Sequence, residues 1–163
     1  MARPLVGLRF GRIEGFAGMG EELALQTMKD AVAAIERSLD KLVERARQKL
    51  SVGMEGPSAP GIAPALHEGM IRDGIGRTKV FVNKGAVRGA WGFGVGPEAI
   101  ARIRAHAARR GEEFGNMFAI ALMNEYGTVN YDLARTHPQR PFIRNTEQEM
   151  QGRVVAEMEA AYL

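Results

Sequence analysis

Residues 123–128 read MNEYGT and residues 137–144 read HPQRPFIR, and these two segments decide how the last third of the chain folds. Gly127 follows an apolar run, and a glycine there lets the chain turn through a positive φ that other residues resist. Both prolines of the second segment fix their own φ and hold it extended. The Phe142-Ile143 pair comes next, and burial stabilises each side chain by about 1.5–3 kcal/mol. We therefore predict a strand, a loop, a rigid apolar anchor and a final helix.

The elements before this stretch follow from apolar periodicity. Residues 5–16 alternate loosely and predict a short strand at a sheet edge. Residues 21–50 carry apolar side chains at steps of three and four, which predicts a long amphipathic helix. We favour packing of this helix on a sheet over a coiled-coil contact with a partner. Residues 78–82 and 89–95 are rich in β-forming side chains and flank the turn-forming residues 83–85, which predicts a hairpin at the centre of the sheet.

Prolines, glycines and capping residues set the boundaries of the later elements. Pro97 is expected to open a helix that Gly111 ends. Residues 112–123 contain a short apolar run that fits a strand or a helix, and we predict a helical start that passes into a strand. Thr146 with Glu149 three residues later matches a capping box, which places the start of the final helix there.

The composition is that of an ordinary globular protein. The 163 residues suit one domain, and 45% of them are hydrophobic and 25% charged. We predict a single domain over residues 1–163 with an α+β fold: a long N-terminal helix packed on a small, mostly antiparallel β-sheet, with a C-terminal helix and long loops. The absence of cysteine excludes disulfides, thiolate metal sites and cysteine nucleophiles. No apolar run reaches the length of a membrane span, so we expect no membrane contact.

Motifs that would indicate an enzyme are incomplete in this sequence. The glycines of residues 89–96 lack the G-x-G-x-x-G spacing of dinucleotide-binding loops, and they fit a twisted strand better. His67-Glu68 lacks the second histidine of H-E-x-x-H, and the serines have no nucleophile-elbow context. We therefore predict no catalytic residues, no metal site, no cofactor and no enzymatic activity.

Positive charge is concentrated in the middle of the chain. Residues 69–111 contain nine Lys or Arg against Asp73 and Glu98, which gives +7, so the rest of the chain must carry −4 to reach the total of +3. Such a surface can face phosphates, or it can be a solvated face that acidic neighbours balance in an assembly. The candidates for facing DNA are Arg102, Arg104, Arg109 and Arg110.

The two decisive segments resemble the signature of phage neck proteins, the head–tail joining or tail-completion proteins of long-tailed bacteriophages. NEYGT at residues 124–128, HPQRPFIR at residues 137–144 and the helix after them occur in the family's order. RIEGF at residues 12–16 and PALHEGMI at residues 64–71 also fit, although the second lacks the Thr-Gly that is usual in the family. The resemblance covers most of the chain in order, and its specific part is the last third.

The resemblance implies a structural virion protein that joins head and tail, or completes the head-proximal end of the tail. It implies a homo-oligomeric ring around the DNA channel, commonly a hexamer, assembled in the host cytoplasm and located in the neck of the virion. Its neighbours would be a head-side connector or stopper, a tail-side terminator or tube protein, and genomic DNA in the channel. The expected interface residues are Glu125, Tyr126, Gly127, Pro138, Arg140, Pro141, Phe142 and Ile143.

Three alternatives remain open at this point. Within the phage interpretation, the chain could be a tail terminator. The basic middle also fits a sequence-independent nucleic-acid-binding protein, whose binding would fall with salt. An enzyme would require acidic and histidine side chains that converge in one pocket.

Overall fold

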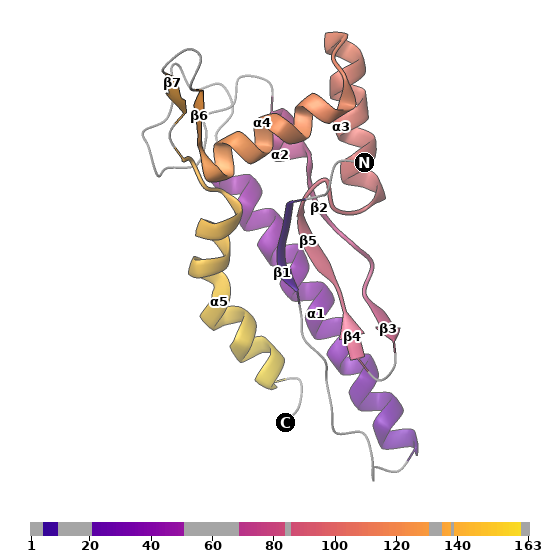
Figure 1. Ribbon diagram of the computed structural model, residues 1–163. Helices are drawn as coiled ribbons and strands as arrows, with labels where there is room; N and C mark the ends of the chain where they lie inside the picture. Colours follow the sequence, from indigo (N-terminus) through magenta and orange to yellow (C-terminus); the bar gives the residue numbers. More distant parts are fainter. Residues whose placement is uncertain are drawn as a thin grey trace.

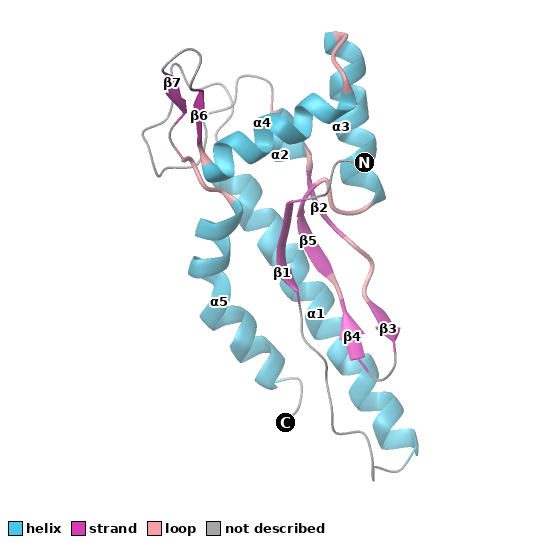
Figure 2. Cartoon of the chain, viewed as in Figure 1, coloured by secondary structure: helices cyan, strands magenta, loops and turns pink. Residues whose placement is uncertain are grey.

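The computed structural model describes residues 5–9, 21–50, 69–83, 86–130, 135–137 and 139–160. The fold is α+β, as predicted, with a long N-terminal helix against a small antiparallel sheet (Figures 1 and 2). The elements in chain order are β1 (Leu5–Arg9), α1 (Glu21–Lys49), α2 (Met70–Asp73), β2 (Ile75–Arg77), β3 (Phe81–Asn83), β4 (Ala86–Arg88), β5 (Ala90–Phe93), α3 (Pro97–Arg110), α4 (Phe114–Tyr126), β6 (Thr128–Asn130), β7 (Arg135–His137) and α5 (Ile143–Ala160).

The strands form one three-stranded sheet and two separate ribbons. The sheet has the order β1-β5-β2, with both pairs antiparallel, and Phe93 in β5 lies opposite Leu5 on one side and Ile75 on the other. β3 pairs with β4 and β6 pairs with β7, each as a two-stranded antiparallel ribbon. α1 and α5 run beside the sheet, while α3 and α4 lie at one end of it (Figure 1).

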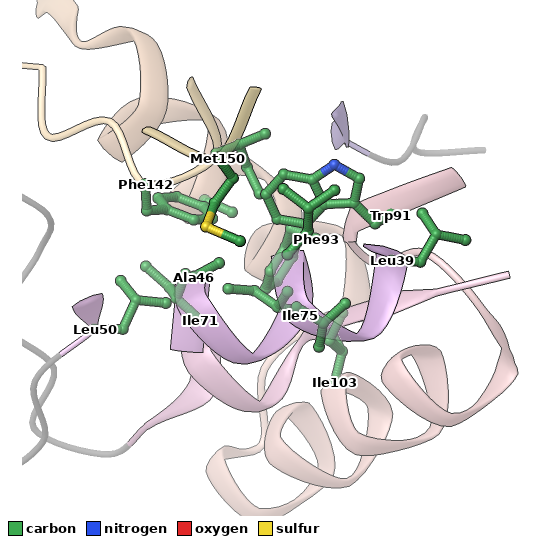
Figure 3. Packing of buried hydrophobic residues seen from close by; sticks show 14 of the residues in the cluster. Leu39, Ala46, Leu50, Ile71, Ile75, Trp91, Phe93, Ile103, Phe142 and Met150 are labelled. Carbon is green, nitrogen blue, oxygen red and sulfur yellow. The ribbon is translucent and has the colours of Figure 1, made fainter. Parts of the chain in front are cut away.

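The core lies between α1 and the sheet. The predicted apolar stripe of α1 is confirmed, because Ile35, Leu39, Leu42, Ala46 and Leu50 are all buried. Trp91 and Phe93 of β5 and Val95 just after it are also buried. Figure 3 shows the side chains of the helices and strands meeting in one cluster. The cluster joins side chains from four parts of the chain, among them Trp91, Phe93, Ile103, Phe142 and Met150.

Salt bridges join the exposed edges of α1 and α5. Glu149 binds Arg45 and Lys49, each at 2.6 Å, and these hydrogen bonds, from Arg45 first and then Lys49, lower the pKa of Glu149 to about 2. Farther along α5, Glu157 binds Lys41 and accepts a hydrogen bond from the buried Ser38. α5 is therefore held to α1 by charge as well as by its apolar face.

Several predicted boundaries hold, because they rest on residues that constrain φ. α3 begins at Pro97, and Gly111 ends it with a φ of 66°. The helical turn expected near residue 70 is α2. β1 lies within the predicted edge strand, and its side chains, like the segments 10–20, 51–68 and 131–134, fall outside the described residues. The predicted loop 53–64, His67 and Pro138 also lie outside them.

Three predictions about local structure are wrong. Residues 114–126 form one continuous helix, α4, so the chain enters Gly127 from a helix and not from a strand. The hairpin at residues 83–85 exists, but it joins only the short strands β3 and β4; β5 turns away to pair with β1 and with β2, which the sequence analysis missed. The first strand of the hairpin, predicted to lie at the centre of the sheet, instead exposes Val82, which is 43% accessible. The reason is that β3 extends beyond the end of the three-stranded sheet, where nothing in the described part of the chain covers it.

The start of the last helix is also different from the prediction. α5 begins at Ile143 and not at Thr146. Thr146 lies in its first turn, where its hydroxyl donates to the carbonyl of Phe142 at 2.7 Å. Glu149 binds cations of α1 and therefore does not complete a capping box.

Candidate functional site

The MNEYGT stretch forms the corner at the end of α4. The helix ends at Tyr126, and Gly127 adopts a φ of 71° while its N–H donates to the carbonyl of Met123 at 2.8 Å. The predicted positive φ is thus confirmed, although the chain enters the corner from a helix. Beyond it, residues 128–130 and 135–137 pair as the β6–β7 ribbon within the predicted loop.

The carboxylate of Glu125 is buried at this corner and caps α5. Its Oε2 accepts the backbone N–H groups of Phe142 at 2.8 Å and Ile143 at 3.0 Å, and its Oε1 accepts that of Arg144 at 3.0 Å. The first N–H groups of a helix have no partner within it, and the N-terminus favours negative charge. Glu125 in α4 therefore provides the hydrogen-bond acceptor for the N-terminus of α5 that a capping residue next to the helix usually provides.

Arg144 covers the carboxylate on its outer side. Its Nε donates to Glu125 Oε1 at 3.2 Å and its Nη2 to the backbone carbonyl of Glu125 at 2.6 Å. The guanidinium also lies over the ring of Tyr126, 5.2 Å from its centroid, and reaches the side chain of Gln139 at 3.1 Å. The corner is a closed unit of a carboxylate, an arginine and an aromatic ring, and only the ring and the arginine reach the surface.

This geometry corrects the predicted interface set. Glu125, Pro141, Phe142 and Ile143 are buried within the chain, so their side chains stabilise its own fold and are not available to a partner. Arg140 is partly buried, and its N–H donates to the carbonyl of Asn124 at 2.6 Å. Of the eight predicted interface residues, three that the structure describes reach the surface: Tyr126, Gly127 and Arg140.

An exposed apolar surface adjoins the corner. Tyr126 is 52% exposed, and Leu122 and Met123 on the preceding turn are 42% and 38% exposed. Residues three and four apart share one face of a helix, so these three side chains form a single surface, which we call the α4 patch. Sequence reasoning missed it because residues 117–123 are apolar throughout, and the pattern does not show which of them face outward.

A second exposed apolar surface lies on the β3–β4 ribbon. Phe81 is 50% exposed and Val82 is 43% exposed, and we call this pair the ribbon patch. The opposite strand presents Val87 inward, where it is fully buried. The two patches lie at opposite ends of the molecule, the ribbon patch beyond the sheet and the α4 patch at the corner near β6 (Figure 1).

The four arginines proposed to face DNA all have contacts within the chain. Arg102 is partly buried and its Nε donates to the carbonyl of Asp73 at 2.7 Å. Arg104 lies over the ring of Phe114 at 5.4 Å, Arg109 contacts His106 at 3.0 Å, and Arg110 binds Glu112 at 2.7 Å. Arg104, Arg109 and Arg110 nevertheless remain exposed on α3, so their contact with DNA stays a prediction.

The described residues show little that would support metal or membrane binding. Among them, no group of three or more His, Asp or Glu side chains is placed to hold a metal ion. Of the three histidines, His106 is buried and contacts Asp73 at 3.3 Å and Arg109 at 3.0 Å. None of the helices in the described part of the chain has the length and apolar character that a membrane span requires.

The chain was compared with known proteins. No protein-family model, curated protein or solved structure matches it. The resemblance of residues 124–128 and 137–144 to phage neck proteins therefore stays a prediction.

Proposed function

We propose that the chain is a structural protein of the neck of a long-tailed bacteriophage, which joins head and tail or completes the head-proximal end of the tail. Copies of it associate head to tail into a ring around the DNA channel. The observation that supports this most directly is the pair of exposed apolar patches at opposite ends of one chain. A closed ring of this kind needs two different surfaces on each copy.

The chemistry of the two patches suits a contact between them. The ribbon patch offers a phenylalanine and a valine, and the α4 patch offers a tyrosine, a leucine and a methionine. Aromatic side chains and methionine are enriched at the centres of protein interfaces. A stable interface buries about 800 Å² on each partner, so each patch is the centre of a larger contact.

The buried corner gives the contact its geometry. The Glu125 cap fixes α5 to the end of α4, and Arg144 holds the ring of Tyr126 in place. A surface that is rigid before binding loses less entropy on association. In this proposal the buried motif residues Glu125, Phe142 and Ile143 do not contact the neighbour; they orient Tyr126 and the exposed side chains beside it, which do.

The test uses one charged substitution in each patch. Phe81→Asp removes the ribbon patch, Leu122→Asp removes the α4 patch without altering the corner, and Val155→Asp alters an exposed apolar side chain of α5 outside both. Light scattering after size exclusion and negative-stain imaging should show rings for the wild type and the Val155 variant. Each patch variant alone should be monomeric.

Mixing the two patch variants tests the direction of the contact. In a head-to-tail contact, the unaltered α4 patch of the Phe81 variant can still bind the unaltered ribbon patch of the other variant. The mixture should therefore form dimers that grow no further. If either variant dimerises alone, the contact pairs like with like, and the head-to-tail ring is excluded. A wild type that stays monomeric as its concentration is raised also contradicts the proposal.

A further inference from the structure

A basic groove of about 330 Å³ lies between α1, β2 and the start of α3, away from both apolar patches. Four of its lining side chains are cationic, Arg47, Arg77, Lys79 and Arg102, and two are acidic, Asp40 and Glu98. Gly76 and Arg77 of β2 and the next two residues, Thr78 and Lys79, also line it. Only one of the four cations, Arg102, belongs to the set that the sequence analysis singled out.

The two acidic side chains leave part of this charge unbalanced. Both carboxylate oxygens of Asp40 accept hydrogen bonds from Arg77, whose Nε and Nη2 donate at 2.5 Å and 3.0 Å, so the charge of Asp40 is already paired. Glu98 is 88% exposed and lies 3.7 Å from Arg102, a weak contact for an ion pair. Arg47 and Lys79 form no ion pair with any carboxylate in the described part of the chain.

Arg47 is the one of the four cations with a buried N–H group that has no hydrogen-bond partner among the described residues. Its Nη2 donates to the carbonyl of Ile75 at 2.7 Å, and the buried N–H group is that of its Nε. Burial lowers the pKa of Arg47, and the neighbouring Arg102 lowers it further. Arg47 is half-buried and makes no ion pair within the described part of the chain, so an anion in the groove would offset the cost of its partial desolvation.

The shape of the groove favours a single small anion. Arginine presents its N–H groups as a planar fork that fits the two oxygens of a carboxylate. Arg102 is already oriented by its hydrogen bond to the carbonyl of Asp73. A continuous chain of phosphates would also come close to the exposed carboxylate of Glu98, which would repel it, whereas one inserted carboxylate needs only the cations.

We propose that this groove binds one carboxylate side chain, an Asp or Glu presented by an acidic segment of a partner protein. The guanidinium of Arg47 and the ammonium of Lys79 are its main contacts, with Arg102 at the side. The inference goes beyond the ring proposal and does not depend on it, because the groove shares no residue with either apolar patch.

The test follows backbone amide resonances of the full chain during titration with a peptide in which one Glu is flanked by glycines. The matched control peptide carries Gln in its place. The Glu peptide should shift the amides of Gly76, Thr78 and Lys79, and the Gln peptide should not. Lys79→Glu reverses an exposed charge without touching the core and should weaken binding about three- to tenfold. Arg104→Glu reverses a charge on the same helix as Arg102, outside the groove, and should leave binding unchanged.

Three results would overturn the proposal. The first is equal shifts with the Glu and Gln peptides, or no shifts with either. The second is a loss of affinity in Arg104→Glu as large as that in Lys79→Glu, which would mean that only the overall charge matters. The third is groove binding by a 20-base-pair duplex that depends on Lys79 while the Glu peptide fails to bind, which would make the groove a nucleic-acid site. The readout is independent of ring formation, so this proposal and the ring proposal can fail separately.

Discussion

Glu125→Gln should destabilise the fold more than any other single change of a charged side chain that we consider. The substitution keeps the size of the side chain but removes its charge and turns an –NH2 group towards backbone N–H donors. Three backbone N–H groups at 2.8–3.0 Å and the Nε of Arg144 lose their anionic acceptor. Hydrogen bonds to a charged group contribute about 1.5–3 kcal/mol each, and they are not additive. Because four such hydrogen bonds to one carboxylate overlap in their effects, we expect a combined loss of about 3–5 kcal/mol.

The assay is urea unfolding followed by circular dichroism, with thermal unfolding as a second measurement. A loss of about 3–5 kcal/mol is a large part of the 5–15 kcal/mol that holds a typical domain together. For a chain of this length it lowers Tm by about 6–20 °C. Glu159→Gln is the control, because Glu159 is exposed near the C-terminal end of α5, the helix that Glu125 caps. If Glu125→Gln costs less than about 1 kcal/mol relative to this control, the cap is not what holds α5 to the corner.

The remaining predictions concern two glycines and one ion pair. Gly96 has a φ of 86°, and a Cβ there would lie 2.0 Å from the backbone oxygen of Arg77, so Gly96→Ala should lower Tm. Gly152 lies within α5 with open space around it, so Gly152→Ala should stabilise the fold by about 0.5–1 kcal/mol in the same urea assay. Equal effects of the two substitutions would contradict this. Hydrogen bonds from Arg45 and Lys49 lower the pKa of Glu149 from 4.5 to about 2, so its stabilising contribution is present above pH 4.5 and is lost as the pH falls to 2. As the pH falls through that interval, Tm should decrease less for Glu149→Gln than for the wild type. If Tm decreases equally in the two proteins, the ion pairs of Glu149 with Arg45 and Lys49 are excluded as a source of stability.

The parts of the fold that could be predicted are those that local rules determine. The helix α1 is 29 residues long, so its apolar stripe spans enough turns for its period to be clear. Pro97 and Gly111 mark the ends of α3 because each restricts or permits a particular φ. These features depend on residues a few positions apart, and the sequence displays them directly.

α4 could not be predicted in the same way. Residues 117–123 are apolar at every position, so neither a period of 3.6 nor a period of 2 stands out. Packing decides the matter: the ring of Phe118 lies edge-on to Phe93 with 5.3 Å between their centroids, and to Phe114 on its own helix at 5.1 Å. A contact with a strand 25 positions away in the sequence is invisible to local pattern reasoning.

The candidate site shows the same limit. Thr146 and Glu149 have the spacing of a capping box, but the cap of α5 comes from Glu125, 17 residues before the first N–H it accepts. Only the folded chain reveals that pair. The apolar patches were missed for the opposite reason, because exposure depends on what the rest of the chain fails to cover.

The buried position of the motif changes what the resemblance to neck proteins can mean. Glu125, Phe142 and Ile143 act inside the chain, so a motif built on them specifies the angle between α4 and α5 and not the identity of a partner. Any chain with this corner would present the end of α4 in the same direction, whatever side chains it carries there. Recognition would then reside in residues outside the motif, such as Leu122 and Phe81, which can change without loss of the fold. If the ring proposal is right, substitutions of the buried corner residues should lower stability and assembly together, whereas substitutions of Leu122 or Phe81 should lower assembly alone.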